Sequence, residues 1–281
     1  MPSIKLNSYA KLNLTFDIVG KLPDGYHRIE SIMHLIDLCD EIELSEIKEN
    51  KVKLRCDLKE LENNKNLAYK FAMLLKKKFK INIGAEIKIN KKIPIGSGLG
   101  GGSSNSATVL LGLNKLWGLG LPNFALMTLA SELGSDVPFF LLGGTAYAYN
   151  RGESVERVDF NGRFMFLVIT TDIRIDTKKA YQLVDIKKTG RKFATQRMLR
   201  AINENKSITE FLHNDFEQFI FQKYPELSKI KEDLIKNGAE NSGLTGSGSA
   251  VFGIFRDKGK LEKAYRILKK LYKYVLITFS K

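Results

Sequence analysis

The chain has 281 residues, of which 43% are hydrophobic and 27% are charged, as in an ordinary globular protein with room for two modest domains. No apolar run is long enough to cross a bilayer, and the first residues lack the apolar block of a secretory signal. We therefore expect a cytoplasmic protein with no membrane partner.

The formal net charge is +14, so a nucleic-acid partner must be considered. The basic clusters fall mostly at expected helix ends or in a polar loop, beside apolar residues that would face a core. We interpret them as solvated helix faces and expect no nucleic-acid partner, although a positive field would help to attract a polyanionic small substrate. The two cysteines, Cys39 and Cys56, are far apart and predict neither a disulfide nor a metal site.

Residues 4–19 predict two strands or one long bent strand, because strand-forming residues alternate along them. The period of two places Lys11 and Asn13 on the same side, opposite Leu12 and Leu14. The two polar residues belong either to an exposed sheet face or to a site.

A Pro-Asp-Gly turn at 23–25 follows this segment and displays Tyr26 and His27 at a loop edge. Such rings suit stacking on a base, although local packing explains them equally well. Beyond the turn we expect three extended segments, at 29–44, 51–55 and 85–93. A helix that Asn66 caps should run to about residue 79.

The stretch from Pro94 to Ser104 reads PIGSGLGGGSS and opens into a helix expected over 105–117. Glycine lets the backbone approach an anion closely, and a helix N-terminus presents unpaired N–H groups and the positive end of a dipole. The loop therefore predicts a phosphate site.

Three familiar kinds of phosphate loop do not fit this stretch. It lacks the GxxxxGK[ST] pattern of a Walker loop, and the chain has no HRD or DFG string of a protein kinase. Gly96, Gly98 and Gly101 match GxGxxG, but the acidic residue that a dinucleotide fold needs about twenty positions later is missing.

Asp136 is the second informative position, just after a helix expected from Pro122 to Gly134. The local sequence favours a cap for a short helix starting at Pro138 over a catalytic base.

The rest of the chain predicts strands, helices and a second glycine loop at 243–249. The basic segment 187–196 is expected to be a mobile connection. The order of elements suggests an α+β sandwich. We expect strands at 145–149, 154–160, 163–171, 250–255 and 274–279, and helices at 177–184, 193–203, 208–221, 226–236 and 260–271.

Three motifs of the chain resemble those of the GHMP kinases: SYAKLNL, PIGSGLGGGSS and GLTGSGSA. Within that superfamily, AKLNLTFDIVGKLPDGYH and GSDVPFFLLGGTAYAYNRGE look like the kinases that phosphorylate a cytidine-diphosphate derivative of methylerythritol in non-mevalonate isoprenoid biosynthesis. The resemblance implies a two-domain α+β GHMP kinase fold. We place an ATP-binding domain related to one ribosomal-protein domain at 1–160, and a ferredoxin-like GHMP domain at 161–281.

The resemblance also implies roles in phosphoryl transfer from ATP with Mg²⁺, the expected co-substrate. Lys11 and Asp136 match the catalytic pair, and no protein ligand for the metal is assigned. The ATP-binding loop comprises Pro94, Ile95, Gly96, Ser97, Gly98, Leu99, Gly100, Gly101, Gly102, Ser103 and Ser104.

The expected partner is a small molecule that carries cytidine diphosphate. By the resemblance, Asn13 and Gly246 contact this substrate. Tyr26 and His27 match the cytosine-binding segment, and Tyr181 would supply a ring on the other side of the base.

Two alternatives remain open. A GHMP kinase for homoserine or mevalonate would share both glycine loops, but the Tyr26–His27 segment argues against it. A basic RNA-binding protein would explain the charge, but it leaves the glycine loops and Asp136 without a role.

Overall fold

The computed structural model describes residues 1–281, which form two compact units interleaved along the chain. Unit 1 consists of Met1–Ala10, Leu38–Ile93 and Gly100–Gly143, and unit 2 of Lys11–Asp37, Pro94–Leu99 and Gly144–Lys281. Since the units follow contacts rather than chain order, the domain boundary expected after residue 160 stays a prediction. No helix combines the length and the apolar character that crossing a membrane requires.

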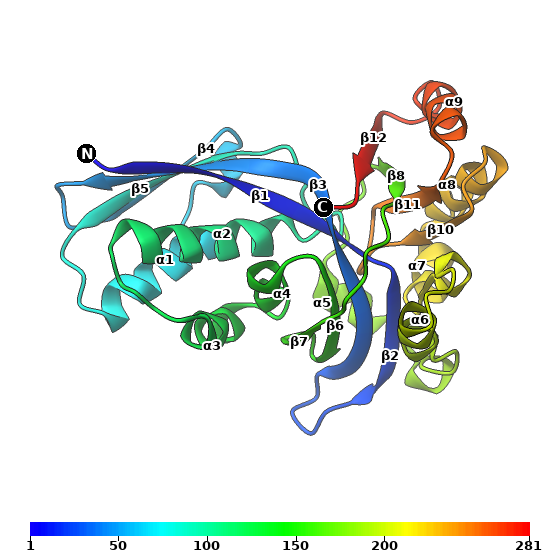
Figure 1. The fold of residues 1–281 in the computed structure, drawn as a ribbon, viewed down its shortest axis with the longest axis horizontal. Helices are drawn as coiled ribbons and strands as arrows, with labels where there is room; N and C mark the ends of the chain where they lie inside the picture. Colours follow the sequence, from blue (N-terminus) through cyan, green and yellow to red (C-terminus); the bar gives the residue numbers. More distant parts are fainter. The chain divides into compact units, whose positions relative to one another are not determined.

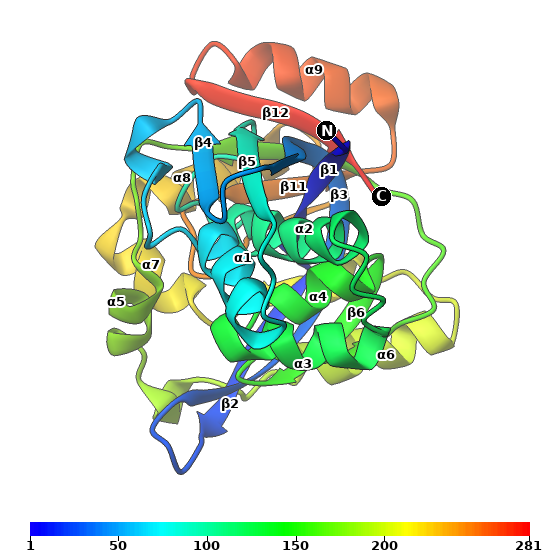
Figure 2. The same ribbon diagram turned by 90° about the vertical axis from the view of Figure 1, so that its left-hand side faces the viewer.

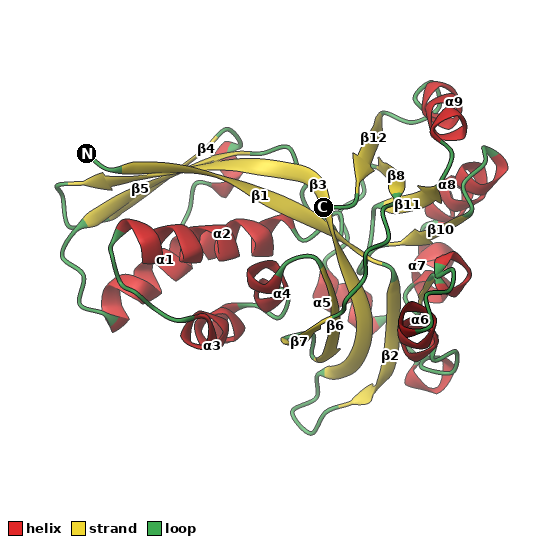
Figure 3. Cartoon of the chain, in the orientation of Figure 1, coloured by secondary structure: helices red, strands yellow, loops and turns green.

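Unit 1 is a sheet with helices on one face (Figures 1 and 3). The second half of β3 pairs antiparallel with β5, and β5 pairs parallel with β4. Helices α1 and α2 lie side by side on this sheet, where Phe71 and Leu110 join Leu44 and Ile87 in one core. The strands are β1 (Ser3–Asn13), β3 (His27–Ile47), β4 (Val52–Cys56) and β5 (Gly84–Asn90), and the helices are η1 (Lys59–Leu61), α1 (Leu67–Lys78), α2 (Gly101–Leu116), α3 (Asn123–Leu133) and α4 (Val137–Leu142).

The helix starts of unit 1 follow from local chemistry. Asn66 Oδ1 accepts a 2.9 Å hydrogen bond from Ala68 N, which confirms the predicted cap of α1. Helix α2 begins at Gly101, four residues before the expected start at 105, because the left-handed Gly100 (φ 75°) lets the chain turn straight into the helix.

Unit 2 contains two groups of strands. In the first, β2 and β6 pair antiparallel with the first half of β3, while β9 pairs parallel with β2. In the second, strand order β10-β11-β8-β12 is antiparallel throughout, with α8 and α9 packed on it (Figure 2). The strands are β2 (Thr15–Lys21), β6 (Thr145–Asn150), β7 (Ser154–Arg157), β8 (Met165–Thr170), β9 (His213–Asn214), β10 (Asn241–Leu244), β11 (Val251–Phe255) and β12 (Tyr274–Phe279). The helices are α5 (Thr177–Gln182), η2 (Ile186–Lys188), α6 (Ala194–Asn203), η3 (Thr209–Phe211), α7 (Glu217–Lys223), α8 (Pro225–Lys236) and α9 (Lys258–Leu268).

One expectation for unit 2 is wrong. The helix expected over 208–221 is interrupted by β9, because Asn214 pairs with β2 and its Oδ1 accepts a hydrogen bond from Phe216 N. The segment 187–196 was expected to be mobile, and that stays a prediction. It contains part of η2 and the start of α6, and Asp215 Oδ2 accepts a 2.9 Å hydrogen bond from Gly190 N.

The first prediction concerns Gly84, where β5 begins beside the turn between β3 and β4. A Cβ here would lie 2.0 Å from Glu49 O and 2.5 Å from Lys51 O, both backbone atoms. We expect Gly84→Ala to lower the free energy of unfolding by about 1–3 kcal/mol, the usual cost of overpacking.

Gly102→Ala is the matched control, because a Cβ at Gly102 meets nothing within 4 Å. It should leave stability unchanged or raise it by about 0.5–1 kcal/mol, since alanine suits a helix better than glycine. Urea denaturation of both variants measures the difference, and equal midpoints would contradict the close backbone contact.

Candidate active site

Lys11 and Asn13 lie at the end of β1, and both are buried, with 2% and 1% of their surface exposed. This burial rules out the alternative that Lys11 and Asn13 belong to an exposed sheet face. Lys11 Nζ donates a hydrogen bond to Asn13 Oδ1, and Asn13 Nδ2 donates to Ser31 Oγ at 2.8 Å. The amide is thereby fixed with its oxygen toward the ammonium group.

The two glycine loops meet in unit 2. Gly98 has a φ of +81°, and a Cβ built on it would lie 2.1 Å from Thr245 O, so only glycine permits this approach. Ala250 N donates to Ser97 O at 2.9 Å, and Lys11 N donates to Leu99 O at 3.0 Å. The first half of the phosphate loop is thus held between β1 and the second glycine loop.

Thr245 links this second loop to β1, although the sequence did not single it out. Its Oγ1 accepts a 3.0 Å hydrogen bond from Asn13 N. Gly246 follows with a φ of +56°, and a Cβ there would lie 3.5 Å from Lys11 Nζ. The predicted residues Lys11, Asn13, Gly98 and Gly246 are therefore neighbours.

Two further residues missed at the sequence level hold the second loop in place. Asn214 Nδ2 donates to Leu244 O and to Gly246 O, each at 2.8 Å. Glu217 Oε1 accepts a 2.9 Å hydrogen bond from Leu244 N. The sequence carried no signal for these roles, because 208–221 was expected to be one helix.

In unit 1, the second half of the phosphate loop forms the start of α2. Ser104 N donates to Gly100 O at 2.9 Å as the first helical bond, so the N–H groups of Gly101, Gly102 and Ser103 have no partner within the helix. The Ser104 hydroxyl donates to Tyr9 O at 2.6 Å and is buried. Ser103 is half-buried and is the better placed hydroxyl for a ligand.

A buried ion pair supports the start of α2. The carboxylate of Asp40 pairs with Lys91 Nζ and accepts hydrogen bonds from the backbone N–H groups of Lys92 and Ile93 at 2.7 and 2.8 Å. Asn105 from the first turn of α2 donates to the same carboxylate at 2.8 Å. A Cβ on Gly101 would lie 3.2 Å from Lys91 Nζ, so a cation sits close beneath the first turn.

Asp136 occupies the residue before α4, but its carboxylate accepts no capping hydrogen bond. The cap that the local sequence favoured is therefore wrong. Helix α4 packs against α2 within unit 1, so Asp136 stands at the start of a helix adjoining the one that carries Gly101–Ser103.

The aromatic residues expected to bind the cytosine base do not form a sandwich around a space for it. Tyr26 is 60% exposed, with the Arg151 guanidinium 5.3 Å from its ring centre. The rings of His27 and Tyr181 stack directly on each other, with centres 4.7 Å apart, which leaves no room for a base between them.

His27 has an unsatisfied polar atom. Its Nε2 is buried and has no hydrogen-bond partner. Burial and then the nearby Lys21 charge lower the pKa of His27, so the ring is neutral at pH 7. The buried Nε2 is therefore an unsatisfied polar atom in a ring that stacks on Tyr181.

Two family models match the chain. The model of the GHMP kinases N terminal domain matches residues 66–144, and the model of the GHMP kinases C terminal matches residues 197–273. The matches fall on either side of the expected domain boundary and agree with a two-domain α+β fold.

Curated relatives match nearly the full length. The chain is 41% identical to the 4-diphosphocytidyl-2-C-methyl-D-erythritol kinase of Thermoanaerobacter pseudethanolicus, with 100% of this chain and 96% of that protein covered. It is 36% identical to the kinase of the same name from Clostridioides difficile, again with 100% and 96% covered.

Solved structures agree with these relatives. A crystal structure of 4-(cytidine 5'-diphospho)-2C-methyl-D-erythritol kinase matches with a TM-score of 0.84 and 28% identity, over 99% of this chain and 100% of that one. Homoserine kinase from Cytophaga hutchinsonii matches with a TM-score of 0.79 over 100% and 95% of the two chains, and its 18% identity indicates a shared fold alone. The resemblance seen in the sequence is thus confirmed, and the chain belongs to the 4-diphosphocytidyl-2-C-methyl-D-erythritol kinase family of the GHMP kinases.

Proposed function

We propose that this chain transfers the γ-phosphoryl group of ATP to the 2-hydroxyl of 4-diphosphocytidyl-2-C-methyl-D-erythritol. Full-length relatives with the name of that kinase support the substrate. The observation that carries the proposal is the buried cluster in which Lys11 and Asn13 meet the two glycine loops. A fixed ammonium beside two anion-binding loops suits phosphoryl transfer.

The phosphates of ATP would lie on the glycine loop and the start of α2. The N–H groups of Gly101, Gly102 and Ser103 have no helical partner and stand at the positive end of the helix dipole. Lys91 beneath the first turn adds to the positive field there, moderated by its partner Asp40. Mg²⁺ would neutralise phosphate charge and keep several waters. The hydroxyls of Ser97 and Ser104 donate to backbone carbonyls, so Ser103 is the serine of the loop whose hydroxyl is left for the metal.

In the proposed reaction, the substrate hydroxyl oxygen attacks the γ-phosphorus as the bond from phosphorus to the bridging oxygen of ADP breaks. Asp136 accepts the hydroxyl proton, and the Lys11 ammonium stabilises the negative charge that develops on the attacking oxygen. Asn13 holds Lys11 in place through its side-chain oxygen. The proton and the phosphoryl group are thus both accounted for.

The cytidine end of the substrate would bind at Tyr26 and His27. The exposed ring of Tyr26 offers a face for stacking, and the neutral ring of the adjacent His27 would add a polar contact to cytosine. Tyr181 stacks on His27, so we assign Tyr181 the role of holding the His27 ring. It does not form the other side of a sandwich around the base.

The second prediction tests the catalytic pair. Asp136→Asn should lower kcat for phosphorylation of the cytidyl substrate by about 10²–10⁴-fold, the usual contribution of a positioned base. Lys11→Ala should lower kcat at least as much, because it also removes charge stabilisation. Product formation is followed by phosphorus NMR, with circular dichroism to confirm folding. Folded variants that retain wild-type turnover would refute the roles of both residues.

The third prediction tests the proposed stacking of the cytosine base on Tyr26. Tyr26→Ala should raise KM for the cytidyl substrate by about 10- to 100-fold and leave KM for ATP unchanged, because one stacked base contributes about 1–3 kcal/mol. Phe124→Ala is the control, since Phe124 is also an exposed ring, at 75%, but lies on unit 1. Equal changes in the two KM values, or a change in the control, would exclude base stacking on Tyr26.

A further inference from the structure

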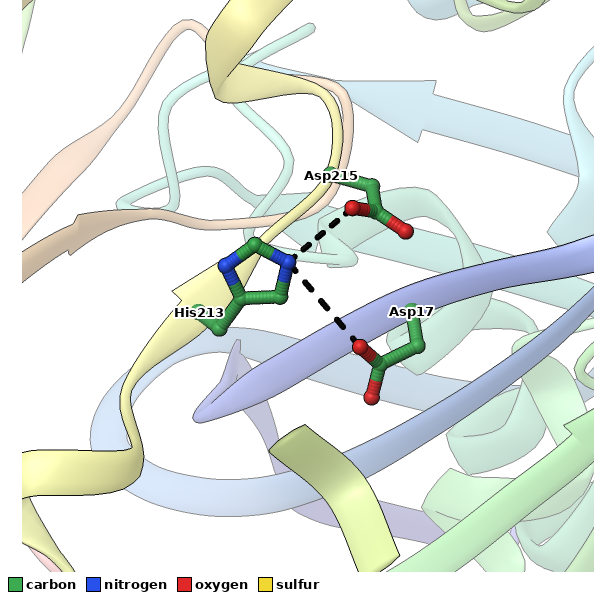
Figure 4. A group of neighbouring side chains, drawn as sticks. All are labelled: Asp17, His213 and Asp215. Carbon is green, nitrogen blue, oxygen red and sulfur yellow. Dashed lines mark hydrogen bonds and ion pairs between the residues drawn. The ribbon is translucent and has the colours of Figure 1, made fainter. Parts of the chain in front are cut away.

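Asp17, His213 and Asp215 form a cluster in unit 2 that the proposed reaction does not use (Figure 4). Asp17 comes from β2, His213 from β9, and Asp215 directly follows β9. The two carboxylates are 1% and 4% exposed. Two buried negative charges at one place need compensation by a cation or a proton.

The donor atoms of the cluster have the spacing of a metal site. His213 Nε2 lies 3.0 Å from Asp215 Oδ1 and 3.9 Å from Asp17 Oδ1, and one ligand atom from each residue falls within 4.8 Å of the others. Two ligands at 2.0–2.2 Å from a tetrahedral zinc ion lie about 3.4 Å apart, between the two observed separations.

The backbone fixes both carboxylates so that their Oδ1 atoms face the imidazole. Asp215 Oδ2 accepts hydrogen bonds from Ile18 N at 2.7 Å and Gly190 N at 2.9 Å. Asp17 Oδ2 accepts one from Thr195 N at 2.7 Å, while its Oδ1 receives a longer contact of 3.3 Å from Ala194 N. Outer hydrogen bonds of this kind orient carboxylate ligands in metal sites.

A cavity next to the cluster gives solvent access. It has a volume of about 590 Å³, and His213 and Asp215 both line it. Lys188, Arg191 and Lys192 line it as well, so a position open to this cavity would favour water or an anion as a further ligand. Three protein ligands and one open position form a common arrangement around zinc.

We propose that Asp17, His213 and Asp215 bind one divalent cation of the zinc and cobalt class, with a fourth position open to the cavity. The ion joins β2 to β9 and to Asp215, which directly follows β9, and so stabilises unit 2. Since Asn214 of β9 holds the second glycine loop, the ion also supports that loop indirectly. The site is independent of the proposed reaction, and its test uses no nucleotide.

The experiment is a Co²⁺ titration of the full chain after removal of metals with a chelator. We expect one equivalent to bind, with visible absorption bands of a low-symmetry four-coordinate site. His213→Ala and Asp17→Asn should each weaken binding by at least tenfold. His34→Gln is the matched control, because His34 is also buried but pairs with the hydroxyls of Thr145 and Ser280.

A second measurement covers variants that fail to fold. Zn²⁺ should raise the Tm of the wild-type chain at constant pH, and a chelator should reverse the rise, as for any ligand that binds only the folded state. Equal Co²⁺ binding by wild type and a folded His213→Ala, or a wild-type Tm that metal does not change, would overturn the proposal.

Discussion

The close approach of Gly98 to the carbonyl of Thr245 is the contact on which the candidate site depends. Two loops separated by 147 residues lie so near that no side chain fits at Gly98. The approach brings Gly246 beside Lys11 and lets the hydroxyl of Thr245 bond to the backbone of Asn13. Lys11, Asn13 and the first half of the glycine loop are thereby held in one arrangement, as the preorganised electrostatic site that we propose would require.

Buried polar groups are costly unless each finds a partner, and around the two glycine loops long-range contacts supply those partners. Asn214 donates to two carbonyls of the second glycine loop, and Glu217 accepts from the backbone of the same loop. In unit 1, Asp40 does the same for the entry to α2 by binding two backbone N–H groups and Lys91. Side chains from elsewhere in the chain therefore hold both glycine segments in place, although glycine-rich backbone is flexible by itself.

Elements with a local signal could be predicted from the sequence, and those that depend on distant partners could not. The alternating strands, the Asn66 cap and the glycine loop followed by a helix are all local patterns. The break of the 208–221 helix depends on pairing with β2, and the roles of Thr245 and Asn214 depend on contacts across 232 and 30 residues. The stacking of His27 on Tyr181 is likewise tertiary, so a motif could suggest both rings but could not show that they touch.

The central claim is that this site phosphorylates a cytidyl substrate rather than another small alcohol. The most direct measurement is ADP release with 4-diphosphocytidyl-2-C-methyl-D-erythritol, homoserine and mevalonate as acceptors, at matched ATP and Mg²⁺. We predict that kcat/KM for the cytidyl substrate exceeds the other two by at least 10³-fold, because only that substrate can use the base contacts that we propose at Tyr26 and His27. A higher kcat/KM for an acceptor without cytidine would contradict the account.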